Sequence, residues 1–124
     1  MNNRDTIYRE KLLHLYKNPN NYGELEDCNI KESGHNPYCG DQIEIFIKLE
    51  EGFISGIRWK GEGCVISQVA ASLLTEELKR TNINKLEKIK EDRMLSMLEI
   101  PISFARKQCA LLALKTIKKI RCSR

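Results

Sequence analysis

Two cysteines and one aspartate stand where this sequence is expected to turn tightly, and a third cysteine lies further along the chain. Cys39 and Asp41 flank Gly40, so a single turn can present a thiolate and a carboxylate with no side chain between them. Cys64 ends the glycine-rich run KGEGC, and Cys109 lies in the apolar and basic segment near the end of the chain. Three thiolates and one carboxylate form a soft, negatively charged tetrahedral set, which suits zinc or iron bridged by sulfide. We therefore predict one soft-metal site built from these four residues.

The remaining cysteines and the histidines carry weaker signals. An odd total of five cysteines, without an export signal or a regular spacing, argues against a disulfide framework. Cys28 lies among acidic residues and Cys122 lies in the terminal tail, so we expect both to be incidental. His35 precedes Cys39 by four residues and is an outside candidate for the same site. His14 is interpreted as a structural or exposed residue.

Two strands must position the first two cysteines of the site. Aliphatic and polar residues alternate from Ile43 to Leu49, which is the pattern of a half-buried strand, and a second strand returns after a tight turn. Because this hairpin goes out and back, Cys39 and Cys64 are expected at the same end of the sheet. The predicted strands cover residues 24–31, 43–49 and 53–60, with turns at 32–34 and 51–52.

Helical spacing of apolar residues follows the strands. The predicted helices cover residues 6–17, 65–79, 82–89, 92–98 and 101–120, the last with Pro101 in its first turn. Cys64 would then lie at a helix N-terminus, and Cys109 would follow the cations Arg106 and Lys107, and both settings favour a thiolate. Strands followed by helices indicate an α+β fold, a small antiparallel three-stranded sheet with helices packed on one face.

Length and charge limit the class of protein. The 124 residues fit a single domain spanning residues 1–124, and the net charge of +4 is modest. No apolar run is long enough for a bilayer, and the charged N-terminus does not resemble a signal peptide, so we place the protein in the cytoplasm without a membrane partner. The basic residues from Lys115 to Arg124 are interpreted as a solvated helix face rather than a nucleic-acid interface, with docking of an acidic protein as an alternative.

On these residues the chain resembles the scaffold proteins for iron–sulfur cluster assembly, the U-type scaffolds of the Isc, Suf and Nif systems. The likeness runs from a helix followed by NPNNYG, through NPYCGD and KGEGCVISQVAASLLTEEL, to PISFARKQCALLALKTI. A CGD turn, a Gly-x-Gly-Cys run before a helix and a third cysteine in the last helix are specific in that combination and order.

The resemblance implies a SufE/NifU-like fold and a scaffold function that needs no classical catalysis. Such a protein accepts sulfur from a pyridoxal-phosphate-dependent cysteine desulfurase, assembles a transient [2Fe–2S] cluster and passes it to acceptor apo-proteins. The implied ligands are Cys39, Cys64 and Cys109, with Asp41 as a ligand that keeps the cluster labile, and zinc can occupy the same pocket. Either Cys39 or Cys109 would receive the persulfide first. The cluster would lie within one chain or between two copies, so a homodimer is left open.

One departure from the family pattern leaves the branch open. Gln108 stands directly before Cys109, where Isc-type scaffolds usually have histidine and Suf-type proteins usually have lysine. The main alternative is a zinc-dependent sulfurtransferase partner of a cysteine desulfurase, in which the metal stays and an exchanged thiolate takes the persulfide. A structural zinc domain that binds nucleic acid through residues 115–124 is the third hypothesis.

Overall fold

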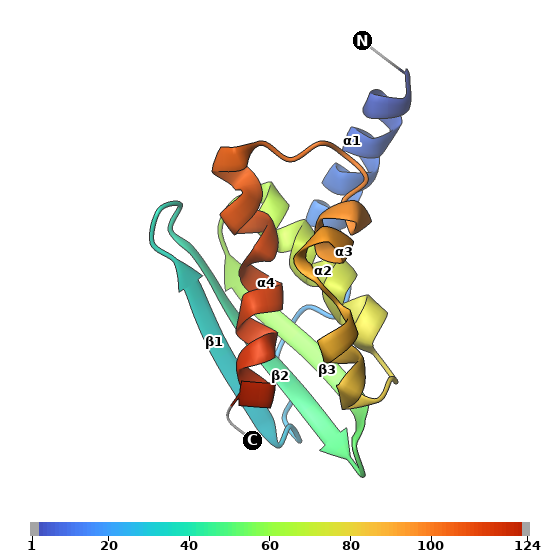
Figure 1. Ribbon diagram of the computed structural model, residues 1–124, viewed down its shortest axis with the longest axis vertical. Coiled ribbons are helices and arrows are strands. Elements are labelled where there is room, and N and C mark those ends of the chain that lie inside the picture. Colours follow the sequence, from blue (N-terminus) through green and yellow to red (C-terminus); the bar gives the residue numbers. More distant parts are fainter. Residues whose placement is uncertain (1–2, 123–124) are drawn as a thin grey trace.

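A three-stranded antiparallel sheet forms one layer of the protein, and helices cover one of its faces (Figure 1). The structure is a computed structural model that describes residues 3–122 of the chain. The elements are α1 (Asn3–Lys17), β1 (Ile30–Asn36), β2 (Asp41–Glu50), β3 (Phe53–Glu62), α2 (Val65–Leu78), the 3-10 helix η1 (Ile83–Lys88), α3 (Glu91–Met97) and α4 (Phe104–Cys122). The predicted α+β class, with helices on one face of a small antiparallel sheet, is confirmed.

The β2–β3 hairpin has the predicted alternation. Ile43, Ile45 and Ile47 are buried under the helices, and the polar residue Glu44 between them is partly exposed. Phe46, which also lies between them, is buried on the opposite face of the sheet. Glu50 pairs with Phe53 across a two-residue turn, so the far ends of both strands meet where Gln42 pairs with Glu62. The hairpin therefore returns the chain to the end of the sheet from which it started.

The first strand lies later in the chain than its sequence pattern indicated. The predicted strand over 24–31 and the predicted turn over 32–34 are both wrong, because β1 begins at Ile30 and contains that turn segment. Gly34 pairs with Ile43 within the strand, and α4 crosses it so closely that a Cβ at Gly34 would collide with the Thr116 hydroxyl. Residues 24–29 connect α1 to β1 instead, so Cys28 lies in a connection and not in a strand.

Two of the helices also differ from their predicted form. The last helix begins at Phe104 and not at Pro101, because Ile100 and Ile102 pack against the core from an extended connection. The short helix predicted over 82–89 is the 3-10 helix η1, whose first turn is capped by the Asn82 side chain accepting a hydrogen bond from the Asn84 N–H. Helices α2 and α3 lie within one or two residues of their predicted bounds.

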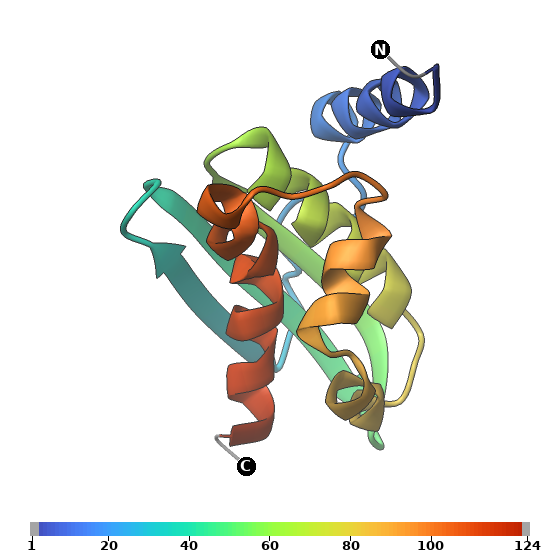
Figure 2. The ribbon, with the colours of Figure 1, turned by 45° about the horizontal axis from the view of Figure 1, so that its top comes forward.

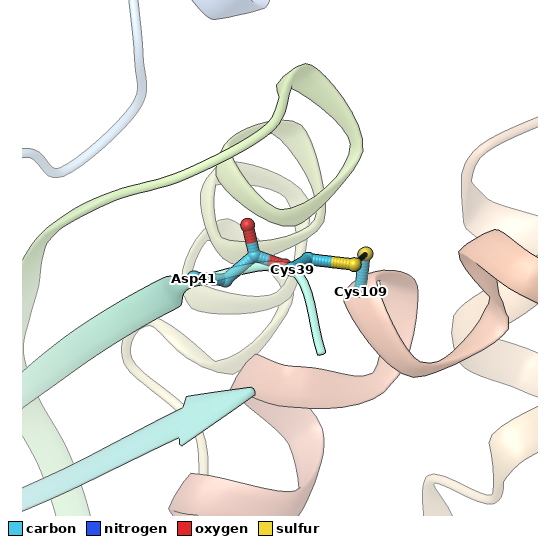
Figure 3. A group of neighbouring side chains, drawn as sticks. All are labelled: Cys39, Asp41 and Cys109. Carbon is cyan, nitrogen blue, oxygen red and sulfur yellow. Dashed lines mark hydrogen bonds between the residues drawn. The ribbon is translucent and has the colours of Figure 1, made fainter. Parts of the chain in front are cut away.

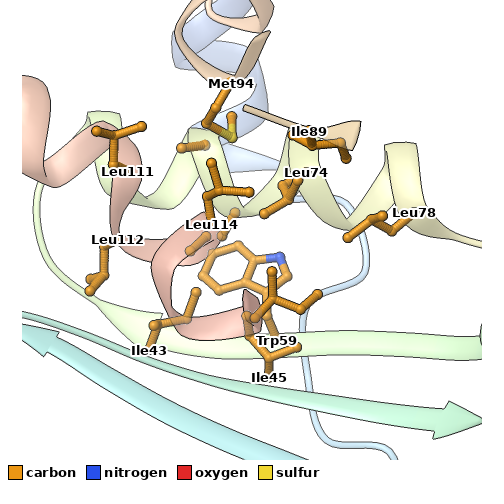
Figure 4. Close-up of a cluster of buried hydrophobic side chains, with 14 of the residues drawn as sticks. Ile43, Ile45, Trp59, Leu74, Leu78, Ile89, Met94, Leu111, Leu112 and Leu114 are labelled. Atoms are coloured by element: carbon orange, nitrogen blue, oxygen red, sulfur yellow. The ribbon is translucent and has the colours of Figure 1, made fainter. Parts of the chain in front are cut away.

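The core lies between the sheet and the helices α2 and α4 (Figure 4). Trp59 of β3 is 1% exposed and lies near Ile45, Leu74 and Leu114 in the same cluster. Its indole N–H donates to the carbonyl oxygen of Asn20 at 2.8 Å, which ties the NPNNYG loop to the sheet and satisfies the one polar group of the buried ring. This packing fixes α4 across β1 and β2, so the start of α4 lies at the same end of the sheet as the β1–β2 turn (Figure 1).

Helix α1 packs against α2 and extends away from the sheet (Figure 2). Leu12 is its buried contact, whereas Ile7, Leu13 and Tyr16 are about half exposed. Within residues 3–122, no helix combines the length and the apolar character needed to cross a membrane.

Candidate metal site

The β1–β2 turn carries the first cysteine of the predicted site. The carbonyl oxygen of Asn36 accepts hydrogen bonds from the backbone N–H groups of Cys39 at 3.3 Å and Gly40 at 2.9 Å. Gly40 has φ +72, a conformation that glycine adopts without strain, and it returns the chain into β2 at Asp41. The turn leaves Cys39 exposed at the end of the sheet.

Asp41 is the first residue of β2, and its side chain is fully buried. Its Oδ1 accepts a hydrogen bond from the Cys64 N–H at 2.9 Å. Its Oδ2 is also buried but has no hydrogen-bond partner among the residues that the structure describes. A buried carboxylate oxygen without a partner is costly unless a cation or a donor neutralises it, so Oδ2 is an available ligand atom.

Cys64 is the N-cap residue of α2, as the glycine-rich run before it predicted. Gly63 precedes it with φ +149, and a Cβ at Gly63 would collide with Oδ1 of Asp41. The glycine is therefore required for the chain to pass close to the carboxylate and to aim the Cys64 N–H at it.

Cys109 lies in the second turn of α4 and is fully buried. Its Sγ donates a hydrogen bond to the Sγ of Cys39 at 3.1 Å, and Figure 3 shows the two sulfur atoms side by side. Burial raises the pKa of the Cys109 thiol, and the neighbouring Cys39, Asp41 and Cys64 side chains raise that pKa further. The expectation that nearby cations favour its thiolate is wrong, because burial disfavours the charged form and the Arg106 side chain is exposed.

The structure brings three of the four predicted ligands into one group. The ligand atoms of Cys39, Asp41 and Cys109 all lie within 4.8 Å of one another. Cys64 is not a member of this group, although its thiol lies close enough to Cys109 to contribute to the raised pKa of that residue. Two thiols and a carboxylate with one unpaired oxygen fit a soft divalent metal or iron, and the Cys64 backbone N–H contacts the same carboxylate.

The other residues singled out from the sequence lie apart from this group. His35 is on the exposed face of β1 and lines a shallow groove of about 850 Å³ with Gln42 and Glu62. Gln108 accepts a hydrogen bond from Lys115 at 2.6 Å on the exposed side of α4. Cys28 lies in the connection before β1 and His14 is exposed on α1, and the side chain of Cys122 lies outside the described residues.

Sequence reasoning missed Asn36, whose side chain the structure places against Cys109. Asn36 is buried at the end of β1, and its Nδ2 donates to the Sγ of Cys109 at 3.7 Å. The only signal was its place in the motif NPYCGD, where an asparagine before proline is read as a turn residue.

Known proteins are similar to this chain in sequence and in fold. The family model described as NifU-like N terminal domain matches residues 7–120. The zinc-dependent sulfurtransferase SufU of Bacillus subtilis is 38% identical, in a match that covers 74% of this chain and 64% of that protein, which is less than two thirds of its length. The iron–sulfur cluster assembly scaffold protein IscU of Thermotoga maritima is 30% identical over 91% of both chains.

A solved structure supports the same fold. The N-terminal part of a NifU-like protein from Brucella abortus superposes with a TM-score of 0.76 over 94% of each chain at 20% identity, a likeness that concerns the fold alone. The family model spans nearly the whole chain, and the IscU relative matches along almost all of its own length. This chain therefore belongs to the NifU-like N-terminal domain family, which includes the IscU and SufU proteins.

Proposed function

We propose that this protein is a scaffold on which an iron–sulfur cluster is assembled and from which it is passed to acceptor apo-proteins. Cys39, Asp41, Cys64 and Cys109 are the proposed ligands. The observation that carries the proposal is the group of two thiols and a buried carboxylate at one end of the sheet, in which one carboxylate oxygen has no hydrogen-bond partner among the described residues. Membership of a family that includes the IscU scaffold proteins supports the same function.

Sulfur enters the site from a cysteine desulfurase, the partner proposed from the family relationship. A thiolate of this chain attacks the outer sulfur of the desulfurase persulfide, so the new S–S bond forms here and the desulfurase cysteine leaves as a thiolate. Exposure favours Cys39 as the first acceptor, because Cys39 lies on an exposed turn whereas Cys109 is buried. The Sγ atoms of Cys39 and Cys109 lie 3.1 Å apart, so sulfur bound at Cys39 is delivered beside the proposed ligand Cys109.

Release is the second requirement of a scaffold. A carboxylate is a harder ligand than a thiolate, so a cluster held partly by Asp41 is bound less firmly than one held by thiolates alone. We propose a [2Fe–2S] cluster as the cargo, which would leave the protein unchanged after each transfer and would make it a scaffold and not an enzyme. One chain offers all four ligands, so the proposal needs no second copy of the protein.

A zinc-dependent sulfurtransferase is the second candidate function. Its support is the name of the Bacillus subtilis relative and the suitability of sulfur and carboxylate ligands for zinc. In that function zinc would remain in the site, and exchange of one thiolate ligand would free that thiolate to accept sulfur from the desulfurase.

Anaerobic reconstitution with iron and sulfide separates the two functions. A scaffold is expected to develop the visible absorbance of a [2Fe–2S] centre and to pass the cluster to added apo-ferredoxin, so that the absorbance is found with the ferredoxin once the two proteins are separated. A sulfurtransferase is expected to retain zinc under the same conditions and to increase desulfurase turnover. The Cys28→Ser variant is the matched control, because Cys28 lies outside the group. Loss of metal or cluster in that variant would contradict the proposed ligands.

The structural zinc domain makes a different prediction. It requires that chelation unfolds the chain. The apolar core between the sheet and α2 and α4 is built without the metal ligands, apart from the burial of Cys109 against it. We therefore expect the fold to persist after treatment with a chelator, as measured by circular dichroism.

A further inference from the structure

Asn36 connects the parts of the proposed site that come from different elements. It is the last residue of β1, it pairs in register with Asp41, and it is 5% exposed. A buried asparagine at the end of a strand must satisfy its amide group, because an unpaired buried amide is costly. Its side-chain partners in this structure are the Tyr38 N–H in the β1–β2 turn and the Sγ of the proposed ligand Cys109.

The orientation of the Asn36 side-chain amide follows from its neighbours. Its Oδ1 accepts a hydrogen bond from the Tyr38 N–H at 3.2 Å. A backbone N–H can only donate, so the oxygen end of the amide must face Tyr38. The NH₂ end is then left facing Cys109, and Nδ2 lies 3.7 Å from its Sγ, within the range of a hydrogen bond to sulfur.

The sulfur of Cys109 therefore lies between two groups with different roles. Its thiol hydrogen points to Cys39, and Asn36 donates to its lone pair. When a metal replaces the thiol hydrogen, the contact with Cys39 as a hydrogen-bond acceptor is lost, but the Asn36 donor is still available. A hydrogen bond to an anionic sulfur is stronger than one to a neutral thiol, because the acceptor is charged.

We propose that Asn36 is a positioning residue of the metal site, which holds Cys109 toward Cys39 and Asp41 and withdraws negative charge from its sulfur. This inference rests on the proposed metal-binding function. Donors to metal-bound sulfur orient the ligand and change the electronic properties of the metal. Asn36 also organises the turn that carries Cys39, since its backbone oxygen accepts from the Cys39 and Gly40 N–H groups. One residue thus places ligands from the β1–β2 turn and from α4.

Two substitutions remove the donor in different ways. Asn36→Asp keeps the shape and the acceptor for Tyr38 but replaces the donor by a charged acceptor. Asn36→Leu keeps a similar volume and adds no charge. An effect that both variants share is therefore due to the missing donor. The control is Asn29→Asp, because Asn29 lies just before the same strand and its side chain bonds to the backbone of Leu49 at the other end of the sheet.

The measurement is cobalt binding by each purified variant, followed by competition with zinc. Both Asn36 variants are expected to bind the metal about 10- to 100-fold more weakly than the native chain, which is the usual effect of losing an outer partner of a metal ligand. Their sulfur-to-cobalt charge-transfer band is expected at longer wavelength, because the sulfur carries more negative charge. Circular dichroism and thermal unfolding establish that each variant is folded, and the band position reports on the sulfur and not on stability.

The outcomes separate this inference from the function on which it rests. Native affinity and an unshifted band in the folded Asn36 variants would overturn the role of Asn36 and leave the metal site intact. Absence of cobalt and zinc binding by the native chain would overturn the metal site, and the role of Asn36 with it. Weaker binding in Asn29→Asp as well would also overturn the inference, because the effect would then not depend on the donor to Cys109.

Discussion

The two oxygen atoms of the Asp41 carboxylate have different environments. Oδ1 is held by the Cys64 N–H, whereas Oδ2 is buried without a partner in the described part of the chain. One oxygen therefore fixes the orientation of the carboxylate, and the other is available to a metal. This division suits a ligand that binds and releases without moving the backbone.

Replacing Asp41 by alanine is expected to make a reconstituted cluster last several-fold longer. The exchangeable carboxylate is lost, so the cluster is held by thiolates, which are the softer and tighter ligands for iron and sulfide. The measurement is the decay of visible absorbance after a chelator is added to the loaded protein. Asp27→Ala is the control, because Asp27 is exposed in the connection before β1. A shorter lifetime in Asp41→Ala would contradict the role given to this ligand.

At the scale of the elements, the site depends on the connections at one end of the sheet. The β1–β2 turn supplies Cys39, the connection from β3 to α2 supplies Cys64, and α4 supplies Cys109. Gly63 lets the second of these connections pass against Asp41, and any Cβ there would displace the carboxylate. The geometry of a connection therefore controls a ligand that belongs to a different element.

Gly63→Ala tests this dependence, with Gly40→Ala as its matched control. Both glycines have positive φ, so Gly40→Ala is expected to lower the free energy of unfolding by about 1–2 kcal/mol, and Gly63→Ala is expected to lower it further because its Cβ also collides with Asp41. At Gly40 an added Cβ meets no atom within 4 Å outside its own chain neighbours, so the site is expected to keep its metal. At Gly63 the Cβ displaces Asp41, so metal content is expected to fall. Denaturant unfolding gives the free energy of unfolding, and metal analysis gives the metal content. Equal metal content in both variants would contradict the inference that Gly63 determines the position of the Asp41 carboxylate.

At the scale of the whole molecule, one end of the protein is chemically distinct. The proposed ligands lie there, together with Tyr38 and Phe104, which are 91% and 92% exposed. Aromatic side chains that are almost fully exposed are unusual, and aromatic residues are enriched among those that contribute most to binding of a protein partner. In the proposed function a desulfurase delivers sulfur to Cys39 and therefore approaches this end, so we expect the two aromatic side chains to contact it.

Replacing Tyr38 or Phe104 by serine is expected to weaken binding of the desulfurase roughly tenfold, or about 1.4 kcal/mol. Phe53→Ser is the control, because Phe53 is 52% exposed at the other end of the sheet, beside the β2–β3 turn. Isothermal titration calorimetry with the desulfurase measures the change. If both variants bind the desulfurase as tightly as Phe53→Ser does, the docking surface must lie elsewhere.

Much of the fold was predictable because its patterns are local. Alternation over residues 43–49 identified β2, and the glycine-rich run before Cys64 identified the start of α2. The first strand was misplaced because its residues, IKESGHN, alternate weakly and contain a glycine. That strand is stabilised by pairing with β2 and by the cover of α4, and neither is encoded within the segment itself.

The sequence by itself determined the types of ligand and the connections that carry them, because a thiol, a carboxylate and the glycines beside them are properties of short segments. Only the tertiary structure decided which ligand atoms meet and how each is buried. The contact of Cys109 with Cys39 joins residues 70 positions apart, and that of Asn36 with Cys109 joins residues 73 positions apart. Both contacts exist because the apolar core packs α4 across the end of the sheet, and the same packing orients the Asn36 amide and buries the unpaired oxygen of Asp41.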